Sequence, residues 1–137
     1  MCKILIVDNH PKWLDFSKEV LESHGYEVVT ALTVDSLQVL LDRNNHDLIL
    51  INAAFMFGEF QEPIRRLFAK NADRKPIIVV SVPSSRDRAL EETRTAFKMG
   101  AKDFVEKPFG NKQLLTLIKH LLDEFVGDKA KRQGVIP

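Results

Sequence analysis

Short apolar runs rich in Ile, Leu and Val recur along the chain, and a polar residue follows each of them. The continuous runs at residues 4–7, 48–51 and 77–80 are typical of strands that are buried on both faces of a parallel sheet. Weaker strand patterns occur at residues 27–30 and 104–105. The chain is therefore predicted to contain five strands, of which three are central.

The segments between these runs carry apolar residues at helical spacing. The predicted helices begin at about His10–Pro11, at Thr33 or Asp35, at Pro63, at Arg86 and at Asn111, and Gly25, Asn44–Asn45, Gly100 and Gly127 end four of them. Alternating strands and helices imply right-handed crossovers and a doubly wound α/β domain with a parallel sheet. We assign residues 1–126 to this domain and residues 127–137 to a polar tail or the start of a linker.

Length and charge restrict the function. A chain of 137 residues suits a single domain, and a net charge of +1 offers no basic excess for direct nucleic-acid binding. The single cysteine, Cys2, excludes an intramolecular disulfide and a cysteine-based zinc site, and is interpreted as an incidental thiol. The longest apolar stretch, residues 48–57, is shorter than the roughly 20 residues that span a bilayer. These features predict a cytoplasmic protein without a membrane segment.

Polar side chains follow four of the predicted strands. In open parallel sheets, ligands and reactive groups collect beyond the carboxyl ends of the strands, so these side chains are expected to converge. They are Asp8, Asn9, Asn52, Ser81 and Lys107.

Four segments carry a family resemblance: residues 4–8, 47–52, 76–81 and, most specifically, 100–109, which reads Gly-Ala-Lys-Asp-Phe-Val-Glu-Lys-Pro-Phe. Over residues 3–126 the chain resembles the receiver domain of response regulators in two-component signalling. The resemblance implies a flavodoxin-like fold with strand order 2-1-3-4-5 and five helices. It also implies a pocket in which two adjacent acids and an aspartate ending the third strand hold Mg²⁺, and that aspartate accepts a phosphoryl group.

This chain departs from the family pattern at decisive positions. The phosphoacceptor position is Asn52 and the second metal-binding acid is Asn9, while Met56 and Phe60 replace the usual Pro and Gly of the following loop. That loop is therefore expected to be rebuilt. The positions that match the family are Asp8, Ser81 and Lys107.

These departures predict a degenerate receiver, or pseudo-receiver. An amide is a poor nucleophile, and hard Mg²⁺ needs anionic oxygen ligands, so we expect no catalytic residue, no enzymatic activity and weak or lost Mg²⁺ binding, with Asp8 as the remnant of the metal site. Asp8 and Lys107 are expected to pair directly. The function predicted is phosphorylation-independent signalling through contact with a histidine kinase, a phosphotransfer protein or an output domain.

Alternative interpretations stay open at this stage. The domain could accept phosphate on an unconventional residue, for which Asp8 is the candidate, or it could bind a small molecule in the same crevice. Phe104 stands where receivers carry a switch aromatic, although a plain core role is slightly favoured, and Phe104 with Pro108 marks the predicted output face. The domain could form a homodimer through this face, which consists of helix four, strand five and helix five. The Lys107–Pro108 bond could be cis or trans.

Overall fold

The computed structural model describes residues 2–43, 46–70, 76–83 and 86–132. Its strands are β1 (Lys3–Val7), β2 (Glu27–Ala31), β3 (Leu48–Asn52), β4 (Ile77–Val82) and β5 (Asp103–Glu106). Its helices are α1 (Pro11–Glu22), α2 (Val34–Arg43), α3 (Gln61–Lys70), α4 (Arg86–Lys98) and α5 (Asn111–Arg132), and two short 3₁₀ helices, η1 (Ala53–Met56) and η2 (Gly58–Phe60), connect β3 to α3.

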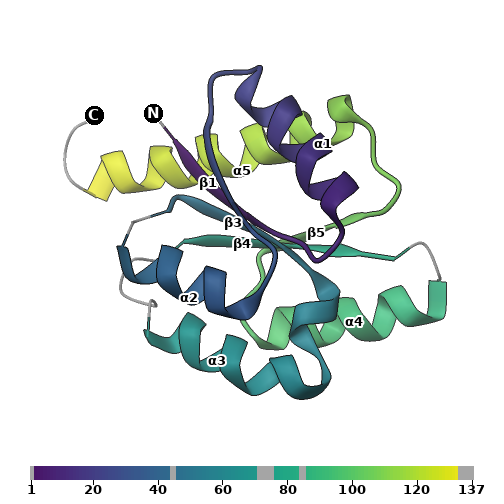
Figure 1. Cartoon of the computed structure of the whole chain (residues 1–137). Helices are drawn as coiled ribbons and strands as arrows, with labels where there is room; N and C mark the ends of the chain where they lie inside the picture. Colours follow the sequence, from purple (N-terminus) through teal and green to yellow (C-terminus); the bar gives the residue numbers. More distant parts are fainter. Residues whose placement is uncertain (1, 44–45, 71–75, 84–85, 133–137) are drawn as a thin grey trace.

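The strands form one parallel sheet in the order β2-β1-β3-β4-β5. Helices α1 and α5 cover one face of the sheet, and α2, α3 and α4 cover the other (Figure 1). This arrangement confirms the predicted α/β fold and its 2-1-3-4-5 order.

Alternation along each strand divides the core into two halves. In β1, Leu5 and Val7 belong to the cluster beneath α2, α3 and α4, whereas Ile4 and Ile6 belong to the cluster beneath α1 and α5. Successive side chains of a strand point to opposite faces of the sheet, so a strand covered on both sides is apolar at every position. This explains the uninterrupted runs in the sequence.

Two predicted helix boundaries are wrong. Helix α3 begins at Gln61, two residues before Pro63, because a proline within the first helical turn removes an N–H that has no partner inside the helix. Helix α5 continues through Gly127 to Arg132. A glycine inside a helix costs only about 1 kcal/mol relative to alanine, so it ends a helix only where the backbone turns left-handed. The first residues of the predicted tail are therefore helical, and residues 133–137 lie outside the described part.

The only cysteine lies at the edge of the core beneath α5. Cys2 is partly buried against the second cluster. Burial, with a smaller contribution from the Asp47 carboxylate, raises the pKa of the Cys2 thiol above its ordinary value. A raised pKa lowers the thiolate fraction at neutral pH, and the thiolate is the reactive form. This environment fits the interpretation of Cys2 as an incidental thiol.

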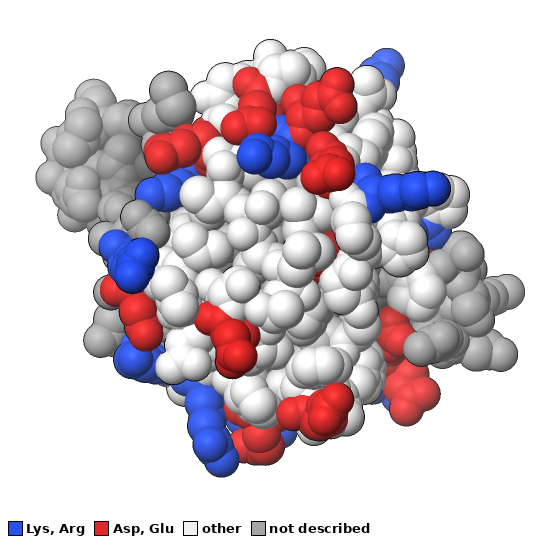
Figure 2. All heavy atoms as spheres, viewed as in Figure 1, with Lys and Arg blue, Asp and Glu red and all other residues white. Residues whose placement is uncertain are grey.

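The described surface carries mixed charge. On the face shown in Figure 2, acidic and basic side chains are interspersed around an uncharged central area. Within the described residues, none of the helices has the length and apolar character needed to cross a membrane.

Candidate functional site

The predicted polar residues come from four strands whose carboxyl ends lie at one edge of the sheet. Asp8 and Asn9 directly follow β1, and Asn52 is the last residue of β3. Ser81 lies in β4 as the register partner of Asn52. Lys107 follows β5, where its backbone N–H donates to the Val82 carbonyl at 2.8 Å.

The side-chain amide of Asn52 links the two residues that follow β1. Its Nδ2 donates hydrogen bonds to Asp8 Oδ1 and to Asn9 Oδ1, each at 3.0 Å. Its Oδ1 accepts the backbone N–H of Ala54 at 3.2 Å, at the start of η1. Asn52 is thus the N-cap residue of η1. Because this hydrogen bond fixes the amide oxygen, the two N–H groups of the amide point at the side-chain oxygens of Asp8 and Asn9. The amide nitrogen thus lies between the side chains that follow β1.

Asp8 is the buried anion of the site. Its Oδ2 accepts a hydrogen bond from Lys107 Nζ at 2.9 Å, and its Oδ1 accepts the backbone N–H of His10 at 2.9 Å in addition to the Asn52 amide. The Asp8 side chain is 7% exposed and that of Lys107 is 15% exposed. A buried carboxylate is tolerated when it is paired and hydrogen-bonded, and both conditions are met here. The expected Asp8–Lys107 pair is confirmed.

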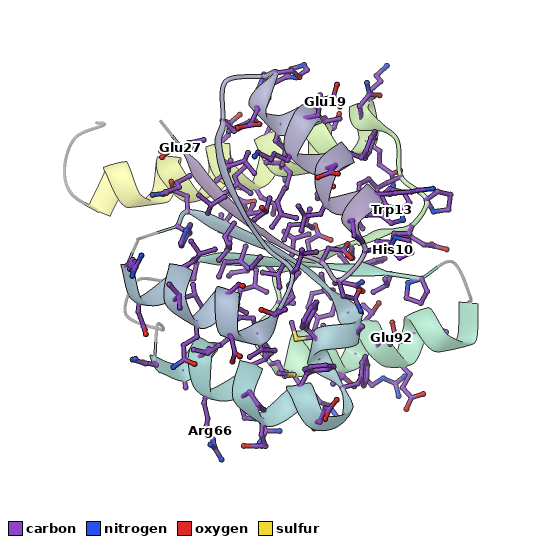
Figure 3. The ribbon with its side chains drawn as sticks, viewed as in Figure 1. His10, Trp13, Glu19, Glu27, Arg66 and Glu92 are labelled. Carbon is purple, nitrogen blue, oxygen red and sulfur yellow. The ribbon has the colours of Figure 1, made fainter. Side chains whose placement is uncertain are left out.

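An aromatic group on the other side of Lys107 was missed from the sequence. Lys107 Nζ lies 5.4 Å from the centroid of the Trp13 ring, within the range of a cation–π interaction. The Trp13 ring contacts those of Phe16 and Phe109, with centroids 5.8 and 4.7 Å apart. Figure 3 labels Trp13, in the first turn of α1, and His10, the N-cap residue that precedes the helix. Helical spacing in the sequence cannot show that the Trp13 ring reaches Lys107, which lies in a distant part of the chain.

The remaining predicted site residues occupy different environments. Ser81 is 2% exposed beneath the site, and the Lys107–Pro108 peptide bond is cis. The favoured interpretation of Phe104 as a core residue is wrong, because its side chain is 41% exposed and its ring stacks edge-on against Phe97 of α4 at 6.5 Å. Phe104 alternates with the buried Val105, which takes the inward position of β5.

The loop that departs from the family pattern is built from apolar residues. Met56 is fully buried and Phe55 nearly so, whereas Phe60 is 37% exposed and packs its ring 5.5 Å from that of Phe55. Gly58, the first residue of η2, adopts a φ of +59°, a conformation that glycine takes at little cost. The buried Phe55 and Met56 fix the position of η1. The Ala54 N–H of η1 in turn donates to the side-chain oxygen of Asn52.

The sequence of this chain is similar to those of known regulatory proteins. The family model described as "Response regulator receiver domain" matches residues 4–119. The transcriptional regulatory protein CpxR of Escherichia coli (strain K12) is 28% identical over 123 residues, which cover 89% of this chain and 50% of CpxR. The nisin biosynthesis regulatory protein NisR of Lactococcus lactis subsp. lactis is 31% identical over 117 residues, 85% of this chain and 48% of NisR. The chain thus spans about half the length of these relatives.

Solved structures show the same architecture. A response regulator receiver domain protein (CheY-like) from Methanospirillum hungatei JF-1 is 26% identical and superposes with a TM-score of 0.79, covering 93% of this chain and 98% of that one. The structure of NtrX from Brucella abortus in complex with ADP superposes with a TM-score of 0.78, covering 98% of this chain and 30% of the NtrX chain. At 23% sequence identity, this similarity shows the fold alone. With the strand order, the convergent polar residues and the family match in agreement, this chain belongs to the response regulator receiver domains of two-component signal transduction.

Proposed function

We propose that this receiver domain signals through protein contacts without accepting a phosphoryl group. Receiver domains are in general signalling modules and not enzymes, and we extend this to the present chain. The observation that carries the proposal is the amide of Asn52, which stands at the acceptor position and is hydrogen-bonded to both residues that follow β1.

The chemistry of Asn52 argues against phosphoryl transfer. A carboxylate oxygen can attack phosphorus and form an acyl phosphate, whereas an amide oxygen is a far weaker nucleophile. The Asn52 oxygen also accepts the Ala54 N–H, which withdraws electron density from it further. Asp8 is the carboxylate left in the site, and both of its oxygens already accept hydrogen bonds from Asn52, His10 and Lys107. Among the described residues of the site, the one carboxylate therefore has both oxygens engaged and is not available as a nucleophile.

The donor set is also unsuited to Mg²⁺, the ion that the family implies. Mg²⁺ requires oxygen ligands in near-octahedral geometry and is commonly bound through one or two carboxylates. Here the Asn52 N–H groups face the oxygens of Asp8 and Asn9, and the Lys107 ammonium holds the second Asp8 oxygen. The charges of Asp8 and Lys107 cancel, so the site offers no net negative charge. We infer that the amide and the ammonium take the place of a cation and that no cofactor is needed.

Phosphorylation by a small donor tests this proposal. The chain is incubated with acetyl phosphate and Mg²⁺, and its intact mass is measured; we expect no species heavier by one phosphoryl group. A conventional receiver domain treated in parallel shows that the donor is active. A phosphorylated species would contradict the proposal, and peptide mapping would then show whether Asp8 is the unconventional acceptor.

An exposed apolar surface on α4 and β5 supports contact with a protein partner. Leu90 and Phe97 lie seven residues apart on α4 and are 61% and 42% exposed, and Phe97 contacts the ring of the exposed Phe104 on β5. A contiguous exposed apolar patch commonly marks an interaction site. We propose that this face, at the predicted output surface, binds a second copy of the domain or a signalling partner such as a histidine kinase, a phosphotransfer protein or an output domain.

Self-association through this face is open to a direct measurement. In sedimentation velocity over a range of concentrations, we expect the unmodified chain to dimerise and the Phe104→Ser variant to stay monomeric. Because Phe104 is exposed, the substitution is expected to change the free energy of unfolding by no more than about 1 kcal/mol. Leu32→Ser is the matched control, since Leu32 is 49% exposed and lies beyond β2 at the opposite edge of the sheet. If the Phe104→Ser variant dimerised as strongly as the Leu32→Ser variant, this face would be excluded as the dimer interface.

A further inference from the structure

A cavity lies between α3 and α4, apart from the polar site. Its volume is about 670 Å³, within the range of roughly 300–1,000 Å³ that is usual for small-molecule sites. Across the described residues these two helices are not closely packed against each other, although both cover the same face of the sheet (Figure 1). Its floor consists of Ile49 and Ile78, near the amino ends of β3 and β4. The cavity therefore lies toward the end of the sheet opposite Asn52 and Ser81.

The walls of the cavity are partly apolar and partly polar, since α4 itself contributes Thr95 and Lys98. Phe68 of α3 and Met99, directly after α4, flank the floor, and Leu41 of α2 closes one side. The residues that α3 contributes are spaced as one helical face, at positions 61, 65, 68 and 69. Gly100, with a φ of +109°, ends α4 beside Ile78 without adding a side chain to the space.

Two cations contribute to the lining, one from each helix. Arg65 and Lys98 both line the cavity. Arg65 Nη1 is already paired with Glu62 Oε1 at 2.7 Å, whereas Lys98 has no ion pair among the described residues. With Arg65 paired to Glu62, which lies outside the lining, Lys98 is the cation of the lining that is left for a ligand. Arg66, the neighbour of Arg65, points away from the molecule in Figure 3 and takes no part in the lining.

We propose that this cavity binds a medium-chain carboxylate, a ligand with an apolar chain and a single negative charge. The chain would lie on Ile49, Ile78 and Met99 between the two helices, and the carboxylate would face Lys98 and the free N–H groups of Arg65. A monoanion matches the one lining cation, Lys98, that has no ion pair among the described residues, and an unbranched chain matches the apolar residues of the lining. This inference is independent of the chemistry at Asn52.

A methyl NMR titration with decanoate, at concentrations below its critical micelle concentration, tests this proposal. We expect saturable shifts at the methyl groups of Ile49, Ile78 and Met99, and much weaker ones with decyltrimethylammonium, which has the same chain and the opposite charge. Lys98→Glu should weaken decanoate binding about fivefold or more, as reversal of an exposed charge pair allows. Lys102→Glu, on an exposed lysine outside the cavity, should leave binding unchanged.

A cavity-filling variant locates the ligand. Thr95→Phe adds a ring to the lining and should weaken decanoate binding by at least about tenfold, because the ring would occupy the part of the cavity proposed for the alkyl chain and two groups cannot share the same packed space. Its thermal unfolding is recorded to show that the domain still folds. Three results would each overturn the proposal: shifts that do not saturate, equal binding of decanoate and decyltrimethylammonium, or undiminished decanoate binding by a folded Thr95→Phe variant.

Discussion

Replacing Asn52 with Asp is expected to make the stability of this domain depend on Mg²⁺. The substitution removes the two hydrogen bonds that the amide donates to Asp8 and Asn9 and places a second carboxylate beside the buried Asp8. In a chelator, the loss of these bonds and the new repulsion should lower the free energy of unfolding by about 1–3 kcal/mol. Added Mg²⁺ should reverse the loss, and a hundredfold excess over its Kd would contribute about 2.7 kcal/mol.

Thermal unfolding of three proteins, with and without Mg²⁺, checks this prediction. The unmodified chain should unfold at the same temperature in both conditions, and Asn52→Asp should unfold earlier without the ion. Asn52→Leu is the control, because it removes the amide without adding a carboxylate and should be destabilised in both conditions alike. If Asn52→Asp were as stable as the unmodified chain in a chelator, the hydrogen bonds that the Asn52 amide donates to Asp8 and Asn9 would not be what stabilises this site.

Removing the Lys107 ammonium should destabilise the domain more than any exposed lysine would. Lys107→Met leaves the Asp8 carboxylate buried without its counterion, and breaking a buried ion pair costs about 3–5 kcal/mol. We expect about 3 kcal/mol, the lower end of this range, because Asp8 keeps the hydrogen bonds from Asn52 and His10. Lys119→Met, on an exposed part of α5, is the matched control and should change the free energy of unfolding by less than about 0.5 kcal/mol.

A double-mutant cycle separates the ion pair from the packing of the lysine stem. Asp8→Asn keeps an oxygen that can accept from Asn52 and His10 while it removes the charge. Denaturant unfolding of both single variants and of the double variant should show that the double substitution costs about 1–3 kcal/mol less than the sum of the two. Additive effects would mean that the 2.9 Å contact between Asp8 and Lys107 contributes no coupling energy.

Much of the fold could be predicted from the sequence because buried parallel strands leave an unmistakable pattern. The runs at 4–7, 48–51 and 77–80 can be uniformly apolar only if both faces of the sheet are covered, and helices α1 and α5 on one side and α2–α4 on the other supply that cover. The convergence of Asp8, Asn52 and Lys107 followed from the same topology, since the carboxyl ends of parallel strands share one edge of the sheet.

Local geometry at the site could not be predicted in the same way. That Asn52 donates with its nitrogen and accepts with its oxygen depends on the η1 turn, which orients the Ala54 N–H. The contact between Trp13 and Lys107 joins residues 94 positions apart, and helical spacing reports only that a ring is partly buried. Phe104 was misplaced for a related reason: a strand of four residues is too short for alternation alone to fix which side chain faces the core.

The most direct test of the central claim is an amide NMR titration of the unmodified chain, first with Mg²⁺ and then with Mg²⁺ and beryllofluoride, which mimics a bound phosphoryl group. The resonances to follow are those of Asp8, Asn52, Ser81, Lys107 and Phe104. Our account predicts that they do not shift in either step, because the Asn52 amide and the Lys107 ammonium already satisfy the oxygens of the site. Saturable shifts at Asp8 and Asn52 that extend to Phe104 would contradict it and would restore a phosphorylation-dependent switch.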